Sequence, residues 1–143
     1  MKVENGLYPA PEQLENLRID SSAEPVVMLN LLKFRARAQY ADGRNADLTG
    51  MQAYRLYADA MQKIVEREGG KFLFAADIRY LLIGEVEKLW DMAALVEYPS
   101  AATFVRIVTS AEMAQIEIHR AAGLEGQLLI CLSRRWPGQV MTA

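Results

Sequence analysis

The chain has 143 residues, of which 52% are hydrophobic, and its 16 basic and 18 acidic residues leave a formal net charge of -2. This length suffices for one domain with a sizeable core and is short for two. The charges form no block of one sign, which argues against nucleic acid or a membrane surface as a partner. No stretch has the length of a membrane span and the first residues lack a signal-peptide core, so we expect a cytoplasmic protein.

The sequence predicts three parts: an N-terminal extension over residues 1–24, one domain over 25–133, and a tail over 134–143. The extension carries a short helix at 10–18, with proline in its first turn. The domain begins with a strand at 25–34, because this run is rich in β-branched and aliphatic residues.

A long helix is predicted after a polar loop at 35–49. Thr49 and Gln52 fit a capping box, in which the threonine oxygen accepts a backbone N–H and the glutamine side chain returns to the capping residue. Apolar residues then recur at three- and four-residue steps until Gly69 and Gly70 supply a left-handed stop.

The rest of the domain predicts two strands, two helices and a final strand. The expected elements are a strand at 71–84, its hairpin partner at 90–98, a helix capped by Ser100, a helix at 111–122 and a strand at 127–133. Thr109 to Glu112 fits a second capping box, and Gly123 supplies the stop of the helix that follows. The only cysteine, Cys131, has apolar neighbours, so we expect a buried and unreactive thiol.

The order strand, helix, strand, strand, helix, strand is that of the split βαβ, or ferredoxin-like, α+β fold. In that fold (βαββαβ) two helices cover one face of a four-stranded antiparallel sheet. All four predicted strands are apolar on both faces, whereas a sheet with one solvated face alternates apolar and polar residues. The remaining residues are too few to cover the second face. We therefore expect a homodimer in which two sheets form a dimeric α/β barrel.

Asn30 is the polar exception within the apolar run 25–34. A buried amide without a partner costs roughly 1–3 kcal/mol, so Asn30 needs a hydrogen bond or faces a polar pocket. A pocket beside Asn30 could lie in either of two places: between the sheet and its helices, or between the two sheets of the expected dimer. Alternation along the strands assigns to the space between the sheets Met28, Asn30, Leu32, Asp77, Arg79 and Glu97.

Four segments together resemble a known family: LNLLKF at 29–34, GMQAYRLY at 50–57, ALVEYPS at 94–100 and HRAAGL at 119–124. Over about residues 25–131 the chain is similar to the family called domain of unknown function 1330, in the dimeric α/β-barrel superfamily. The resemblance implies the fold and the dimer, but no established activity. Wider relatives include cofactor-independent oxygenases, lactone isomerases and haem proteins, so a reaction follows only by analogy. Met113 stands where the family often has tyrosine.

Three residues are candidates for catalysis. His119, the only histidine, is the candidate base because its unperturbed side chain titrates near neutral pH. Asn30 and Tyr54 are candidates to stabilise an oxyanion. The residues expected to contact a ligand are Lys33, Tyr57, Arg79, Trp90, Glu97 and Arg120. Each also has a structural interpretation: a cation at a helix carboxyl end, core tyrosines with polar tips, satisfied charge pairs and aromatic packing.

The sequence has no clustered metal ligands, no glycine-rich phosphate loop and no nucleophile elbow, so we expect neither a metal nor another cofactor. It leaves three functions open. The first is an enzyme of the cofactor-independent oxygenase or isomerase type, in which His119 or a carboxylate removes a proton from a small organic molecule. The second is a non-catalytic ligand-binding module, and the third is an accessory homodimer without a small ligand.

Overall fold

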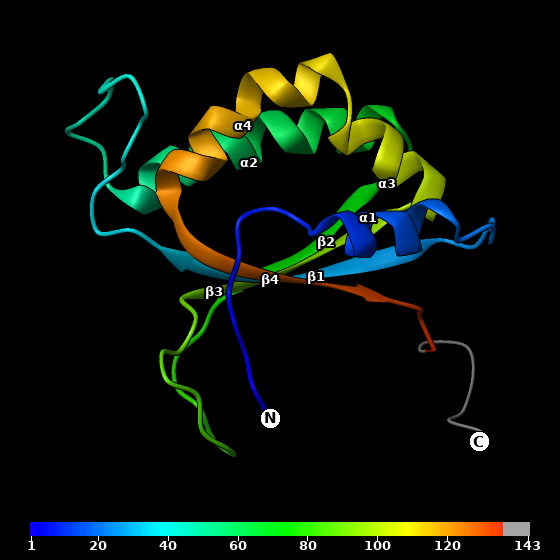
Figure 1. Cartoon of the computed structure of the whole chain (residues 1–143), viewed down its shortest axis with the longest axis horizontal. Coiled ribbons are helices and arrows are strands. Elements are labelled where there is room, and N and C mark those ends of the chain that lie inside the picture. The colour runs from blue at the N-terminus through cyan, green and yellow to red at the C-terminus, as the bar shows by residue number, and fades with distance from the viewer. Residues whose placement is uncertain (136–143) are drawn as a thin grey trace.

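The computed structural model describes residues 1–135, which form a four-stranded antiparallel sheet with its helices on one side (Figure 1). In the sheet order β2-β3-β1-β4, the strands are β1 Val26–Phe34, β2 Lys71–Asp77, β3 Met92–Tyr98 and β4 Leu124–Leu132. The helices are α1 Pro11–Arg18, α2 Gly50–Arg67, α3 Ala101–Val108 and α4 Ala111–Gly123. The elements β1, α2, β2, β3, α4 and β4 follow one another in the predicted ferredoxin-like order, and α1 and α3 are additional to it. The expectation of a tail at 134–143 lies mostly outside the described residues.

The start and end of α2 follow the predicted local chemistry. Thr49 Oγ1 accepts from the backbone N–H of Gln52 at 3.1 Å, and the Thr49 N–H donates to Gln52 Oε1 at 2.8 Å. Gly69 follows the helix with φ +88°, a left-handed conformation that glycine adopts without strain. The long helix is therefore determined by its own ends as well as by its apolar stripe.

The start of α4 differs by one residue from the prediction. Ser110 is the N-cap, and its Oγ accepts from the Met113 N–H at 3.1 Å. Thr109 instead ends α3, where its Oγ1 donates to the Val105 carbonyl at 2.7 Å. The predicted capping box at Thr109 is wrong because two hydroxyl residues are adjacent there and each serves a different helix.

Gly123 was predicted to end α4 by a left-handed turn, but its role is a close approach between two backbones. A Cβ on Gly123 would lie 2.4 Å from the Gly50 carbonyl oxygen, and a Cβ on Gly50 would lie 2.6 Å from the Gly123 carbonyl oxygen. Leu124 then continues directly as extended backbone, so β4 begins three residues before the predicted strand. The glycine pair sets how closely the start of α2 meets the end of α4.

The predicted long strand at 71–84 is only half as long in the structure. Its ladder ends where Asp77 pairs with Met92, after a register shift between Phe72 and Phe74. The Ile78 N–H still donates to the Asp91 carbonyl at 2.8 Å, but residues 79–90 make no backbone–backbone hydrogen bond. This segment, which we call the arm, extends from the sheet on the side opposite the helices (Figure 1).

The two faces of the sheet differ in cover, and the face assignment from alternation was wrong for most residues. Met28 packs with Met61 and Ile64 of α2, so even-numbered residues of β1 face the helices. The predicted residues Met28, Asn30, Leu32 and Asp77 therefore lie on the helix side, Arg79 lies in the arm, and only Glu97 lies on the predicted side. A one-residue change of phase reverses a whole strand, which explains the error.

The helix-free face, which we call the open face, is apolar. Its residues follow from the strand register, in which Leu29 lies opposite both Leu95 and Ile130. The apolar members are Val27, Leu29, Leu31, Phe74, Ala76, Ala93, Leu95, Leu128, Ile130 and Leu132. All except Val27 retain exposed surface in the single chain.

The edges of the sheet are also partly occupied. At the β4 edge, Gly6 and Gln127 exchange two backbone hydrogen bonds of 3.0 and 2.9 Å, which extends the sheet by one bridge. Helix α1 packs beside α3, with Leu17 against the main core. Cys131 is exposed on β4, so the prediction of a buried thiol was wrong; an edge strand leaves its side chain uncovered. Within 1–135 no helix has the length and apolarity to span a bilayer.

Candidate functional site

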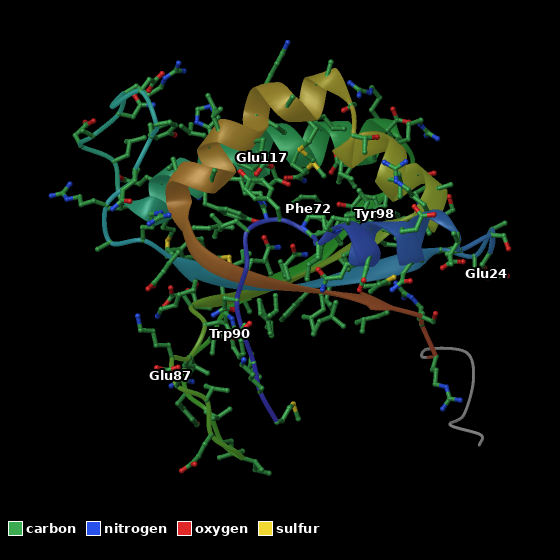
Figure 2. The ribbon with its side chains drawn as sticks, in the orientation of Figure 1. Glu24, Phe72, Glu87, Trp90, Tyr98 and Glu117 are labelled. Atoms are coloured by element: carbon green, nitrogen blue, oxygen red, sulfur yellow. The ribbon has the colours of Figure 1, made fainter. Side chains whose placement is uncertain are left out.

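Polar side chains meet between the sheet and the helices, in what is otherwise the apolar interior of the domain. We call this group the polar cluster, and its members are Asn30, Tyr54, Tyr57, Glu117, Arg120 and Gln127. Strands β1 and β4, and helices α2 and α4, each contribute to it. Figure 2 shows Glu117 directed from α4 toward the sheet, in the same layer as Phe72 and Tyr98.

A continuous chain of hydrogen bonds connects four members of the polar cluster. Gln127 Nε2 donates to Asn30 Oδ1 at 2.8 Å, and Arg120 Nη2 donates to Gln127 Oε1 at 2.8 Å. Arg120 Nη1 in turn contacts Glu117 Oε1 at 2.6 Å. The Asn30 amide also donates to the carbonyls of Met28 and Ala94, at 3.2 and 3.5 Å. Asn30 is therefore fully used within the protein and orients Gln127 and, through it, Arg120.

Spacing along α4 explains why Glu117 and Arg120 point the same way. They are three residues apart, so they occupy one face of the helix, and their side chains are only 25% and 14% exposed. A charge pair with so little exposed surface is partly desolvated, and Arg120 Nη2 makes further hydrogen bonds to the Leu7 carbonyl and to Gln127 Oε1. The pair therefore places a fixed positive and a fixed negative charge above the sheet.

Tyr54 and Tyr57 complete the polar cluster from α2, one turn apart, with ring centroids 5.4 Å from each other. Burial raises the pKa of Tyr54 to about 12; the nearby Arg120 opposes that shift and Glu117 adds to it. Burial also raises the pKa of Tyr57 well above its ordinary value. Both phenols therefore stay protonated, and each offers a neutral O–H donor.

The two phenol hydroxyls are the unsatisfied part of the polar cluster. Within residues 1–135 neither hydroxyl has a hydrogen-bond partner, although every other polar side chain of the cluster has one. Among the partly or fully buried residues of 1–135, Arg35 Nε is the only side-chain nitrogen or oxygen that is both inaccessible to solvent and without a hydrogen bond. The two phenol oxygens, which also lack a partner, are therefore accessible to solvent. A ligand oxygen or a water has access to both.

The N-terminal extension closes one side of the polar cluster. Arg120 Nη2 donates to the carbonyl oxygen of Leu7, and its guanidinium lies 5.6 Å from the centroid of the Tyr8 ring. Further toward the N-terminus, Asn5 Oδ1 accepts from Trp90 Nε1 at 2.7 Å. Trp90, predicted as a ligand contact, thus joins the base of the arm to the extension and lies below the sheet (Figure 2).

His119 lies apart from the polar cluster. Its Nδ1 is 2.6 Å from the hydroxyl of Tyr40, which belongs to the loop between β1 and α2, and the two rings meet edge to face. Burial and the nearby guanidinium of Arg44 lower the pKa of His119. The histidine therefore connects this loop to α4, while Arg120, its neighbour in sequence, points toward the sheet.

The other predicted ligand contacts are distributed over the sheet margin and the arm. Lys33 Nζ lies 3.1 Å from Asp91 Oδ1, and Asp91 Oδ2 accepts from the Phe34 N–H at 2.9 Å. Glu97 pairs with Arg134 at 2.9 Å, and the Arg79 guanidinium lies over the Tyr80 ring. Of the nine predicted site residues, the structure brings together Asn30, Tyr54, Tyr57 and Arg120.

Sequence reasoning missed Glu117 and Gln127. Gln127 precedes five consecutive apolar residues at 128–132, which is the same signal of a polar residue in an apolar strand that identified Asn30. Glu117 lies three residues before Arg120 in a predicted helix, a spacing that places both on one face. Within residues 1–135 no three histidine, cysteine, aspartate or glutamate side chains are grouped in a way that would hold a metal ion.

The chain resembles proteins of known sequence and structure. The profile of a family described as "Domain of unknown function (DUF1330)" matches residues 39–132. The RPA0582 protein of unknown function from Rhodopseudomonas palustris is 32% identical, with a TM-score of 0.84 over 94% of this chain and 100% of that chain. The structure of the methylated RPA0582 protein is 34% identical, with a TM-score of 0.85 over 94% of this chain and 98% of that chain. No curated protein matches the chain.

Proposed function

This chain belongs to the DUF1330 family, and we propose that it binds a small organic molecule between its sheet and its helices, at the polar cluster. The observation that carries the proposal is the pair of unpartnered phenols, Tyr54 and Tyr57, in a layer where the other polar groups are hydrogen-bonded. A phenol O–H that has no acceptor within the protein and still has accessible space beside it can donate to a bound ligand oxygen in place of water.

The chemistry of the polar cluster favours a ligand with a carbonyl or carboxylate group on an apolar body. Both phenols donate hydrogen bonds, and the Arg120 guanidinium adds positive charge nearby. The rings of Phe34 and Tyr54 lie 5.5 Å apart, so an aromatic row of Phe34, Tyr54 and Tyr57 lines the same region. Such rings pack against a flat, apolar ligand body.

The same proposal includes a homodimer, because the open face needs a cover. The chain exposes 9776 Å², whereas a compact monomer of its mass is expected to expose about 7,400 Å². The N-terminal extension, the arm and the open face all contribute to this excess, and a standard interface on the open face would remove about 800 Å² from each partner.

A second candidate function is proton abstraction, favoured by the position of Glu117 beside the two phenols. The carboxylate would take a proton from a carbon next to a carbonyl, and the electrons of the C–H bond would move to the carbonyl oxygen. That oxyanion would accept a hydrogen bond from Tyr54. This step is shared by isomerases and cofactor-independent oxygenases. We assign the base to Glu117 because His119 faces Tyr40.

Benzoate tests the binding proposal, because it combines a flat ring with a carboxylate. Isothermal titration calorimetry should show saturable binding to the wild type, and the variant Tyr54→Phe/Tyr57→Phe should bind about tenfold more weakly or worse. Tyr80→Phe, which changes a tyrosine in the exposed arm, is the matched control and should bind as the wild type does. The proposal fails if benzoate does not bind and native mass spectrometry of the purified protein finds no retained molecule, or if the double variant binds benzoate unchanged.

Phenylpyruvate separates catalysis from binding. If Glu117 acts as a base, the wild type accelerates the enolisation of phenylpyruvate, which is followed by ultraviolet absorbance. The variant Glu117→Gln should then lose that acceleration, whereas His119→Ala should retain it and should bind benzoate as tightly as the wild type. If the wild type does not accelerate the enolisation of phenylpyruvate, the proposal of proton abstraction by Glu117 fails and the binding proposal stands alone.

A further inference from the structure

The arm, residues 79–90, carries an uninterrupted run of large apolar side chains in solvent. Tyr80, Leu81, Leu82 and Ile83 are all exposed, and Leu82 and Ile83 retain 82% and 88% of their full exposure. Scattered apolar residues are common on protein surfaces, but four consecutive ones at the end of a projecting segment form a patch. Such a patch is typical of a surface that is covered by another molecule.

The backbone of the arm is equally unsupported. Within residues 79–90 no N–H or C=O group pairs with another backbone group, and only the carbonyl of Leu89 accepts a bond, from Lys33 Nζ at 3.1 Å. The base of the arm, in contrast, is fixed, because Asp91 bonds to both Lys33 and the Phe34 N–H. The arm therefore has a set direction but no packing along its length.

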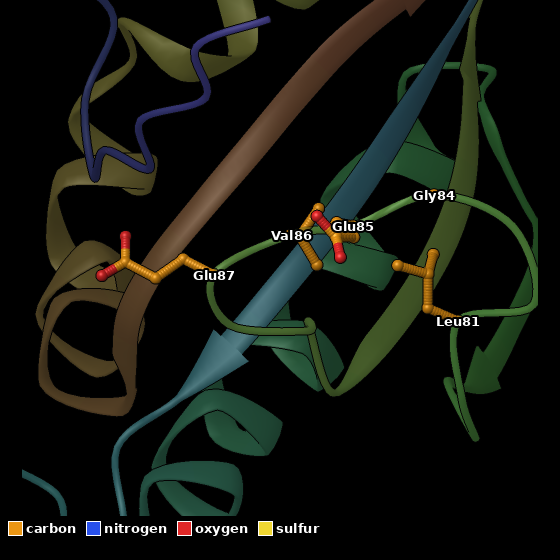
Figure 3. Close-up of a pocket in the computed structure, with 5 residues that line it drawn as sticks. All are labelled: Leu81, Gly84, Glu85, Val86 and Glu87. Atoms are coloured by element: carbon orange, nitrogen blue, oxygen red, sulfur yellow. The ribbon is translucent and has the colours of Figure 1, made fainter.

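The arm also borders an open hollow. Leu81, Gly84, Glu85, Val86 and Glu87 line a space of about 460 Å³ between its two legs (Figure 3). Gly84 has φ +99°, a left-handed conformation, and lies in the bend at residues 82–84. The hollow is wide open, so it suits a side chain inserted from outside better than an enclosed small molecule.

We propose that the arm grips a second copy of this chain and extends the interface beyond the open face, which rests on the homodimer of the proposed function. Two observations select this occupant. The arm projects on the same side as the open face, so a second copy seated on that face meets the arm (Figure 1). A bilayer is the other cover for exposed leucine and isoleucine, but Glu85 and Glu87 in the arm balance Arg79 and Lys88, so the arm has no excess of positive charge to attract anionic lipid.

The consequence for function is that each subunit contributes the arm to its partner. The base of the arm also touches the N-terminal extension, through Trp90 and Asn5, and that extension contacts Arg120 through Leu7. The N-terminal extension therefore contacts both the base of the arm and the polar cluster. The interface and the ligand site are joined by a short path of direct contacts.

The test uses the full chain with Leu82→Ser/Ile83→Ser in the arm, compared with Leu56→Ser, which changes an exposed leucine on α2. Sedimentation equilibrium should show a dimer dissociation constant that rises about tenfold or more for the arm variant and stays unchanged for Leu56→Ser. Circular dichroism should show the same secondary structure in all three proteins, because the arm contributes nothing to the sheet ladder.

Three other outcomes would overturn the inference. A wild type that sediments as a single chain removes both the proposed homodimer and the arm contact. A dimeric wild type whose dissociation constant is the same in the arm variant removes the arm contact alone and leaves the homodimer standing. Loss of flotation with vesicles of phosphatidylcholine and phosphatidylserine in the arm variant, without a change in dimer dissociation, assigns the arm to a membrane instead.

Discussion

The two faces of the sheet differ in kind: the helix side buries polar groups, and the open face exposes apolar ones. On the helix side, Asn30 and Gln127 are polar residues in an apolar layer, and the protein satisfies them internally through Arg120 and Glu117. On the open face the strands carry only apolar side chains near the centre, and nothing in the described chain covers them. A buried polar group can be satisfied from within, whereas a large exposed apolar surface is typical of an interaction site.

The sharpest way to test this contrast uses neighbouring leucines on opposite faces. Leu32 is fully buried beneath the helices, while Leu31 lies on the open face. Leu32→Ala should lower the free energy of unfolding by about 2–5 kcal/mol, because it leaves a cavity in the closed core. Leu31→Ala should mainly weaken the dimer, so its effect on urea unfolding should grow as the protein is diluted. Equal losses that do not depend on concentration would show that the two faces do not differ.

Gly123→Ala tests how tightly the helix side is packed. The new Cβ would lie 2.4 Å from the Gly50 carbonyl oxygen and 2.8 Å from the Tyr54 backbone nitrogen, so α2 and α4 must separate. We expect a loss of about 3 kcal/mol in the free energy of unfolding, at the upper end of overpacking costs. Gly6→Ala is the control, since its Cβ would meet its nearest atom at 3.8 Å. Equal stability of the two variants would mean that the helices are not held in close contact.

The hydrogen-bonded pair of Asn30 and Gln127 permits a double-mutant cycle. Asn30→Leu alone leaves the Gln127 amide without its acceptor and should cost about 1–3 kcal/mol. Gln127→Leu alone should cost a similar amount. The double variant should lose less than the sum of the two, because it leaves neither partner unpaired. Additive losses in urea unfolding would show that the two amides are not coupled.

Tyr54→Phe should give the smallest effect, and only at high pH. The pKa of Tyr54 is raised from 10.0 to about 12 in the folded protein, so the native state holds this proton more tightly than the unfolded chain. The stability contributed by this group is present below pH 10 and is lost as the pH rises toward 12. The variant should lose less stability over that interval, by an amount on the order of 1 kcal/mol. Parallel stability curves for the two proteins would contradict the burial of this phenol.

Sequence reasoning succeeded where a local pattern determines the outcome. The hydroxyl and amide at Thr49 and Gln52 fix the start of α2, and the order of apolar segments is sufficient for the ferredoxin-like fold. Asn30 was identified because a polar residue is conspicuous in an apolar strand. The face of the sheet on which Asn30 lies was predicted wrongly. Side chains alternate between the two faces of a strand, and the sequence does not mark which alternate set contacts the helices.

Other features depend on contacts far apart in the sequence. Residues 78–83 have the composition of a strand, yet the ladder ends at Asp77, and the last backbone hydrogen bond between the two segments is the one that the Ile78 N–H donates to the Asp91 carbonyl. His119 was selected by its chemistry, but rotation around α4 directs it to Tyr40 and directs Arg120 to the sheet. Such choices are made by tertiary packing, which no single segment of the chain contains.

The mass of the wild-type protein in solution tests most directly whether a second copy covers the open face. Sedimentation equilibrium at micromolar concentration should give twice the mass of one chain, and dilution should convert this species to monomer with an increase in exposed apolar surface. A single-chain mass at every concentration up to the solubility limit would mean that the apolar face of the sheet is stable in water, which contradicts the account.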